Sequence, residues 1–197
     1  MEIMLACVLS FAATAVLGRW VFLPLLRRLK AGQAIREAGP KWHAAKAGTP
    51  TMGGLMFITG LGIAILAMGW NGMLAGELTH IYLFLFASVF GVIGFLDDYE
   101  KVKHHQNLGL TAIQKFLLQL AAAILFLMLL RFEGHVTPHL YVPFVNVDLS
   151  LNWPLYMVFS AFVIVGAVNA VNITDGLDGL AASVSWVSLR ALSWAAW

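Results

Sequence analysis

The stretch N-A-V-N-I-T-D-G-L-D-G-L, at residues 169–180, closes a run of uncharged residues that is long enough to cross a bilayer. A crossing helix needs roughly 20 apolar residues. Its two acids, Asp175 and Asp178, therefore come where a predicted membrane helix meets water. A second pair, Asp97 and Asp98, ends another apolar run. Carboxylates are costly in such places and are mostly kept for function, so the sequence predicts chemistry at these four acids.

The composition of the whole chain is that of an integral membrane protein. Of its 197 residues, 60% are hydrophobic and 11% are charged, and the mean hydropathy is +0.83. We predict an all-α fold, a polytopic bundle of transmembrane helices forming a single membrane domain over residues 1–197, because a lipid-exposed backbone must satisfy its own hydrogen bonds. Five complete spans and a truncated sixth are expected, at residues 3–26, 49–76, 78–96, 116–130, 151–171 and from 180 onward.

The distribution of Lys and Arg gives these spans an orientation. Basic residues follow the first and third spans, whereas only Arg131 lies in the intervening segments; the two groups are Arg27, Arg28, Lys30, Arg36, Lys41 and Lys46, then Lys101, Lys103 and Lys115. By the positive-inside rule the N-terminus lies outside and the loops next to the four acids are cytoplasmic. The net charge of +2 reflects this asymmetry beside anionic lipids and indicates no nucleic-acid partner.

Two further features are a predicted hairpin and a single cysteine. Residues 141–149 alternate in part and are punctuated by Pro and Asn, which predicts a short periplasmic hairpin outside the bilayer. The single cysteine, Cys7, excludes an internal disulfide framework and a cysteine-based zinc site.

The loop before the second span ends in K-A-G-T-P-T-M-G-G, at residues 46–54, and has two interpretations. In the structural one, Thr49 caps the helix, Pro50 takes its first position, and the glycines admit a close neighbour. In the functional one, Lys46, the hydroxyls of Thr49 and Thr51, and exposed backbone N–H groups bind phosphate. The pattern alone favours neither, and it is not a Walker A loop.

The pair Asp97 and Asp98 is expected at the C-terminal end of the third span, where the helix dipole disfavours negative charge. Lys101, one turn further on, can compensate for part of that charge. A divalent cation shared with a phosphate would compensate for more. The pair therefore suits magnesium binding or a proton relay better than it suits stability.

The second pair of acids also has a structural interpretation, because Asp175 could cap the following helix and Asp178 could lie in its first turn. Capping does not account for Asn169 and Asn172, which lie one turn apart at the end of the fifth span. Together, the two asparagines and two acids could bind a sugar or nucleotide by hydrogen bonds.

Four strings in combination resemble a known family. They are G-T-P-T-M-G-G at 48–54, G-F-L-D-D-Y at 94–99 followed by Lys101, G-L-T-A at 109–112 followed by Gln114 and Lys115, and the stretch at 169–180. In this order and spacing they resemble the phospho-N-acetylmuramoyl-pentapeptide transferase (MraY, translocase I) family, within the polyprenyl-phosphate N-acetylhexosamine-1-phosphate transferases. The resemblance covers nearly the whole chain. Because family members are roughly twice as long, it implies the N-terminal half of the family fold.

The resemblance implies an enzyme that transfers phospho-MurNAc-pentapeptide from UDP-MurNAc-pentapeptide to undecaprenyl phosphate, forming lipid I and UMP in peptidoglycan biosynthesis. It implies Mg²⁺ as cofactor and a multi-pass protein in the bacterial cytoplasmic (inner) membrane, with the active site facing the cytoplasm. A homodimer is also implied. A further metal-binding Asp and a His-rich segment would lie in the other half of the fold, so these 197 residues alone are expected to be inactive.

The resemblance also implies roles for nine residues: catalysis by Asp97 and Asp98, metal binding by Asp175, and substrate binding by Lys46, Thr51, Lys101, Lys115, Asn172 and Asp178. Asp97 would be the general base. A phosphate monoester is, however, largely dianionic at neutral pH and has little proton to give, so orienting the lipid phosphate is the alternative role.

Three other functions stay open on the sequence. One is another polyprenyl-phosphate sugar-1-phosphate transferase, since related enzymes share the paired acids. A second is a membrane transporter, although carriers hold their charged site near the bilayer midplane and these acids lie at one face. The third is a non-catalytic fragment that binds lipid or partner helices.

Overall fold

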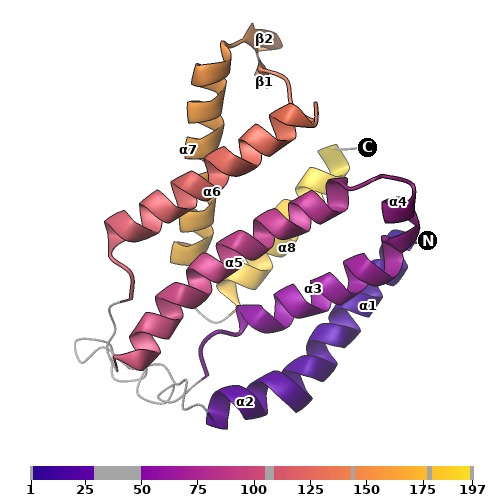
Figure 1. Ribbon diagram of the computed structural model, residues 1–197, viewed down its shortest axis with the longest axis vertical. Coiled ribbons are helices and arrows are strands. Elements are labelled where there is room, and N and C mark those ends of the chain that lie inside the picture. The colour runs from indigo at the N-terminus through magenta and orange to yellow at the C-terminus, as the bar shows by residue number, and fades with distance from the viewer. Residues whose placement is uncertain (1, 29–49, 105–108, 143–144, 177–178, 196–197) are drawn as a thin grey trace. The chain divides into compact units, whose positions relative to one another are not determined.

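The computed structural model describes residues 2–28, 50–104, 109–142, 145–176 and 179–195 (Figure 1). The chain forms two compact units, Met1–Leu118 and Gln119–Trp197, and each is described by itself. Among the described residues, four helical stretches are long and apolar enough to cross a membrane, namely Met4–Arg28, Thr79–Lys103, Ala112–Phe132 and Trp153–Thr174. The prediction of a helical membrane protein is confirmed.

The first span is one continuous helix of three segments, α1 (Glu2–Leu17), η1 (Gly18–Phe22) and α2 (Leu23–Arg28). The middle segment is a π-helix, in which the N–H of Leu23 donates to the carbonyl oxygen of Gly18 five residues earlier. Arg19, which interrupts the apolar run in the sequence, lies within this wider turn and is exposed. The helix therefore continues past its one internal charged residue.

The second predicted span is shorter than expected. Helix α3 (Gly54–Met68) has 15 residues, or about 22 Å at 1.5 Å per residue, against a hydrocarbon core about 30 Å thick. The chain then turns at Gly69 into the five-residue α4 (Trp70–Leu74). Only a residue without a side chain fits at Gly69, because a Cβ there would lie 2.6 Å from Nε2 of His80.

The start of α3 also differs from the structural interpretation of its loop. Pro50 precedes the helix, whose N-cap is Gly53, and Thr49 lies outside the described residues. The expectation that Thr49 and Pro50 begin the helix is wrong. The reason is Met52, whose φ of 65° lies in the left-handed region that a right-handed helix cannot include.

Small residues bring the helices of the first unit together. A Cβ at Gly60 of α3 would meet Oγ1 of Thr14 on α1 and would lie 2.9 Å from the carbonyl oxygen of Ser10. Helix α5 (Thr79–Lys103) also contacts a glycine of α3, but through a side chain, since a Cβ at Gly62 would lie 2.9 Å from the ring of Phe84. In Figure 1, α1, α3 and α5 run side by side. Such close backbone approach is the usual basis of helix packing in membranes.

The second unit is tied together by a buried polar contact. Helix α6 (Ala112–Phe132), which contains the boundary between the units, buries Gln119 to 2% exposure. Asn169 of α7 (Trp153–Thr174) donates from Nδ2 to Oε1 of Gln119 at 2.6 Å and to the carbonyl oxygen of Val165 at 2.8 Å. The last helix, α8 (Leu180–Ala195), follows α7 and makes only a small contact with it.

A two-stranded antiparallel hairpin joins α6 to α7. Strand β1 (His139–Val142) pairs with β2 (Val147–Ser150), and Asn146 adopts a φ of 52° in the turn. Its base is closed by a hydrogen bond of 2.8 Å from the N–H of Leu151 to the carbonyl oxygen of Pro138. The hairpin predicted at residues 141–149 is thus present, and its periplasmic position stays a prediction.

Candidate functional site

Asp97 and Asp98 lie inside α5 rather than at its end. The helix continues to Lys103, well over one turn beyond both acids, so the expectation that they end the span is wrong. The helix dipole acts mainly within the last turn and does not explain their environment. Asp97 is instead buried, with 9% of its surface exposed. A buried carboxylate requires hydrogen bonds or charged partners, and the structure supplies two hydrogen-bond donors and a second ammonium group.

The first donor is Lys101, as the spacing along the helix predicts. Its Nζ lies 2.7 Å from Oδ2 of Asp97, four residues earlier, and 3.0 Å from Oδ1 of Asp98, three residues earlier. One ammonium group therefore bridges both carboxylates. The predicted compensation of the acid pair by Lys101 is confirmed.

The second donor is a backbone amide in the turn that precedes α6. The N–H of Leu110 donates to Oδ1 of Asp97 at 2.9 Å. Gly109 makes this approach possible, because a Cβ at that position would lie 2.5 Å from both the carbonyl oxygen and Oδ1 of Asp97. The glycine is needed here for space rather than for backbone freedom.

The third partner of Asp97 is an ammonium group from the first turn of α6. Thr111 and Gln114 form a reciprocal capping box, in which Oγ1 of Thr111 accepts from the N–H of Gln114 at 3.2 Å and Oε1 of Gln114 accepts from the N–H of Thr111 at 3.0 Å. The capped helix start places Nζ of Lys115 3.8 Å from Oδ2 of Asp97. We call Asp97, Asp98, Lys101 and Lys115 the acid–lysine cluster.

The cluster brings together side chains that can contribute to a phosphate site. Its two ammonium groups meet at one oxygen of Asp97, and lysine binds phosphate as a compact point charge. The side chains of Asp98 and Lys101 are about one-third exposed, so an incoming anion can reach them. The sequence did not predict the roles of Gly109 and Leu110 in holding Asp97, although both belong to the motif G-L-T-A at residues 109–112. The pattern T-x-x-Q that follows is a signal for the start of a helix.

The remaining predicted site residues of the described chain lie elsewhere. Asn172 and Asp175 are exposed at the end of α7 in the second unit, and Thr51 is half-buried in the segment before α3. Lys46 and Asp178 lie outside the described residues. The two groups of site residues belong to different units, so their joint use of one substrate remains a prediction.

The structure corrects two interpretations of the stretch at residues 169–180. Asp175 is the C-cap of α7, its N–H donating to the carbonyl oxygen of Val171 at 3.1 Å, and α8 begins only at Leu180. The interpretation of Asp175 as an N-cap is therefore wrong. Asn169 does not point to a substrate mouth with Asn172, because Gln119 already binds its amide. Because Asp175 does not cap a following helix, its carboxylate lies at the C-terminus of α7, where the helix dipole favours a compensating cation.

The positions of the acids bear on the prediction that Asp175 binds Mg²⁺. No group of three metal-binding side chains occurs among the described residues, and the paired carboxylates of the cluster face Lys101. Mg²⁺ needs only one or two carboxylates when substrate phosphates and water complete its octahedron. The exposed Asp175 carboxylate fits one such ligand position, whereas Asp97 is already occupied by protein donors.

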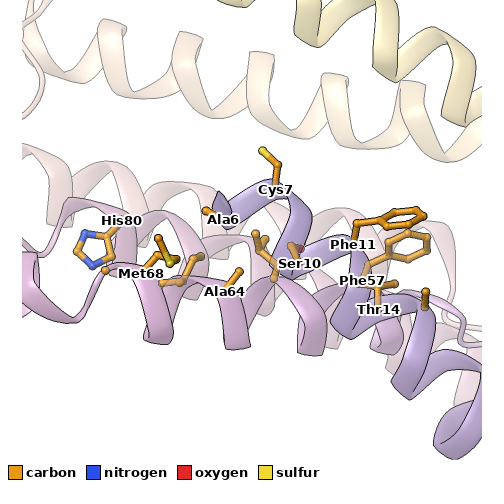
Figure 2. A pocket seen from close by; sticks show the side chains of 13 residues that line it. Ala6, Cys7, Ser10, Phe11, Thr14, Phe57, Ala64, Met68 and His80 are labelled. Atoms are coloured by element: carbon orange, nitrogen blue, oxygen red, sulfur yellow. The ribbon is translucent and has the colours of Figure 1, made fainter. Parts of the chain in front are cut away.

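A groove of about 800 Å³ lies apart from these residues, between α1 and α3 (Figure 2). Its walls are mainly apolar, with Phe11 and Phe57 toward one end and His80 at the other. No predicted site residue lines it. The groove is thus not part of the candidate site.

Comparisons with known proteins agree with the sequence pattern. The model of Glycosyl transferase family 4 matches residues 80–197, and signature 1 of the phospho-N-acetylmuramoyl-pentapeptide-transferases matches residues 46–58. A phospho-N-acetylmuramoyl-pentapeptide-transferase of Geobacillus kaustophilus is 45% identical over 196 residues, which are 98% of this chain and 59% of the relative. One of Listeria welshimeri is 44% identical over 154 residues, 78% of this chain and 47% of the relative. The chain spans about half the length of the curated relatives it matches.

Proposed function

Because the chain belongs to glycosyl transferase family 4 and carries a signature of its phospho-N-acetylmuramoyl-pentapeptide-transferases, we propose that it serves the transfer of phospho-MurNAc-pentapeptide from UDP-MurNAc-pentapeptide to undecaprenyl phosphate. The products are lipid I and UMP. The observation that carries the proposal is the convergence of Lys101 and Lys115 on one carboxylate oxygen of Asp97. This geometry provides two fixed positive charges for a phosphate.

In the proposed reaction, an oxygen of the lipid phosphate attacks the β-phosphorus of the UDP-sugar. A new P–O bond forms, the bond to the α-phosphate oxygen breaks, and UMP leaves with the electron pair. Such a transfer depends on positioning and on neutralising negative charge more than on covalent help from the protein. Lys101 and Lys115 hold the phosphates in line for attack.

Asp97 acts in this proposal as the anchor of the two lysines rather than as a general base. Its Oδ1 accepts from Leu110, and its Oδ2 lies near both ammonium groups, so proton abstraction would require a donor to move away. A largely dianionic phosphate also offers little proton to abstract. Asp98, which is more exposed and shares Lys101, orients the same lysine from the other side.

The other predicted residues complete the proposal. Asn172, Asp178, Thr51 and Lys46 bind the nucleotide-sugar, and Asp175 holds Mg²⁺. When bound there, Mg²⁺ supplies charge neutralisation for the diphosphate. The site lies on the cytoplasmic side of a bacterial membrane, because the UDP-sugar is water-soluble and the lipid phosphate is anchored in the inner leaflet.

The test replaces the matching part of the Geobacillus kaustophilus relative with these 197 residues, so that this chain's own side chains act in a protein of full family length. We expect the chimaera to convert labelled UDP-MurNAc-pentapeptide into a lipid-extractable product with release of UMP. Transport of the label across vesicles without any lipid-linked product would favour a carrier instead. The unaltered relative is the control for the assay.

Variants of the chimaera then test the cluster. Lys101→Ala and Lys115→Ala are expected to lower kcat/KM by about 100-fold, the effect of losing roughly 3 kcal/mol of transition-state stabilisation. Lys103→Ala is the matched control, because Lys103 lies on the same helix and is exposed. Asp97→Asn is expected to lose activity at every pH without moving the pH profile. Near-normal turnover of Asp97→Asn would remove Asp97 from the mechanism.

A further inference from the structure

The register of the hairpin sorts its side chains onto two unlike faces. Residues that stand opposite each other in an antiparallel pair point to the same side, and neighbours along a strand alternate. The pairs Leu140↔Leu149 and Val142↔Val147 therefore form one face, and the pairs His139↔Ser150 and Tyr141↔Asp148 form the other. One face is wholly aliphatic and the other is polar.

The aliphatic face is only partly covered by protein, because Leu140 and Val142 of β1 are half-buried and the two residues of β2 are exposed. Val147 is 40% exposed and Leu149 is 43% exposed, and no described helix packs extensively against either strand. A two-stranded hairpin is at best marginally stable alone in water. Something apolar must therefore cover this face for the hairpin to persist.

The base of the hairpin lies where a bilayer surface is expected. Both flanking helices, α6 and α7, are of spanning length, and α7 begins three residues after β2 ends. Beside that start, the guanidinium of Arg131 lies 4.2 Å from the ring centroid of Trp153, and Tyr156 packs edge-on against the same indole at 5.9 Å. Trp and Tyr gather at membrane–water interfaces, and Arg reaches toward the interface from helix ends.

We propose that the hairpin lies on the membrane surface, with its aliphatic face in the boundary between lipid headgroups and acyl chains. The occupant of the face is lipid, because the hairpin directly joins two helices of spanning length whose ends carry an aromatic and arginine cluster, and because the face itself carries no charge. Its other face, with Asp148 and the Tyr141 hydroxyl bonded to Asn146, stays in water. Amphipathic segments of this kind insert roughly 5–10 Å into the interface.

This proposal rests on the membrane location of the chain and is independent of the proposed catalysis. It assigns the hairpin a task besides linking two helices. The hairpin anchors the ends of α6 and α7 at a fixed depth, which limits how far either helix can slide along the bilayer normal.

The test is made on the full chain reconstituted in bilayers of phosphatidylethanolamine and phosphatidylglycerol. Cys7→Ser removes the one cysteine of the sequence, so that a nitroxide label can be placed at single new cysteines. Val147→Cys and Leu149→Cys report the aliphatic face, and Asp148→Cys and Ser150→Cys are matched controls on the polar face of the same strand. Power-saturation spectra measure collisions of each label with oxygen, which dissolves in lipid, and with a water-soluble nickel chelate.

We expect the ratio of oxygen to nickel collisions to be severalfold higher at 147 and 149 than at 148 and 150. Nickel reaching all four positions equally would overturn the proposal, because the hairpin would then stand in water or lack its strand register. Exclusion of both probes at 147 and 149 would also overturn it, since protein would cover the face. Activity plays no part in this readout, so its failure leaves the proposed transferase untouched.

Discussion

Asp97 is surrounded by donors from three places in the sequence. Lys101 comes from its own helix, Leu110 from the following turn, and Lys115 from the start of α6. The turn contributes through its backbone, so its fit depends on the space at Gly109 rather than on a side chain. The geometry of the acid–lysine cluster thus rests on a residue that carries no charge.

Replacement of that glycine is the sharpest test at this scale. In Gly109→Ala, the new Cβ would lie 2.5 Å from the carbonyl oxygen of Asp97, and the turn must move away. We expect a loss of about 1–3 kcal/mol, typical of overpacking, and faster exchange of the Leu110 amide hydrogen measured by NMR. Gly94→Ala on α5 is the control, because a Cβ there meets nothing within 4 Å. Unchanged exchange at Leu110 in Gly109→Ala would contradict the role given to Gly109.

The separation in sequence between two partners determines whether their contact in the cluster can be predicted. Lys101 follows Asp97 by four residues on one helix, so their contact can be read from the sequence alone. The Leu110 contact spans 13 residues and passes through a turn whose path no periodicity encodes. The same limit applies to Asn169, whose partner Gln119 is 50 residues away, although two amides within apolar runs are a general signal for pairing.

At the scale of elements, the helices of the first unit touch at glycines, which lie against small polar residues in one contact and against the ring of Phe84 in another. In α3 the contact with α1 centres on Gly60, which lies against Thr14 and Ser10. Dispersion contacts between closely approaching backbones replace the hydrophobic effect, which lipid does not supply. Helix pairs of this kind are sensitive to a single added methyl group.

Gly60→Ala is therefore expected to separate α1 from α3. Its Cβ would collide with Oγ1 of Thr14 and crowd the backbone of Ser10, at a cost of about 1–3 kcal/mol. Gly54→Ala, in the first turn of the same helix, is the control because nothing lies within 4 Å of its added Cβ. Steric trapping in bicelles measures both free energies of unfolding. Equal stabilities would mean that Gly60 does not form the contact.

The Gln119–Asn169 hydrogen bond gives a second prediction for helix pairing. Gln119→Leu and Asn169→Leu, alone and together, form a double-mutant cycle. We expect a coupling free energy of about 0.6–2 kcal/mol, the range of hydrogen bonds between membrane helices. The single variant Asn169→Leu should cost more than the double variant, because it leaves the buried Gln119 amide unpaired. Additive effects would show that the two side chains do not interact.

Helix boundaries were the least predictable property of the elements. Apolar runs gave the positions of the spans, yet α5 extends to Lys103, past the acids that end its apolar run, because Lys101 pairs with both carboxylates and lets the helix continue. At the start of α3 the opposite happens, since the left-handed Met52 delays a helix that Pro50 could have begun. In both cases a local interaction, and not hydrophobicity, determines the boundary.

At the scale of the whole molecule, the chain matches part of longer relatives, and its predicted site residues fall in two units. The family relationship extends over nearly all of its residues, but these cover only 59% of the Geobacillus kaustophilus relative. The acid–lysine cluster lies in one unit, and Asn172 and Asp175 lie in the other. The cytoplasmic orientation and the homodimer implied by the family resemblance remain predictions for the complete protein.

We therefore expect a polypeptide of these 197 residues, purified in detergent with Mg²⁺ and both substrates, to release no UMP above the background without enzyme. The Geobacillus kaustophilus relative under the same conditions is the positive control. UMP release comparable to that of the relative would show that the matched portion is catalytically sufficient.

The π-helical turn at Gly18–Phe22 has a consequence for helical phase. A π turn holds one residue more than an α turn, so it acts as an insertion within an otherwise regular helix. Each residue of an α-helix advances the azimuth by about 100°. Deleting Arg19 would restore regular winding and would swing Leu26, now 3% exposed, out of its buried position together with the arginines that follow. The extra residue in the π-helical turn thus sets the rotation of α2 relative to α1 about the helix axis, and this rotation buries Leu26.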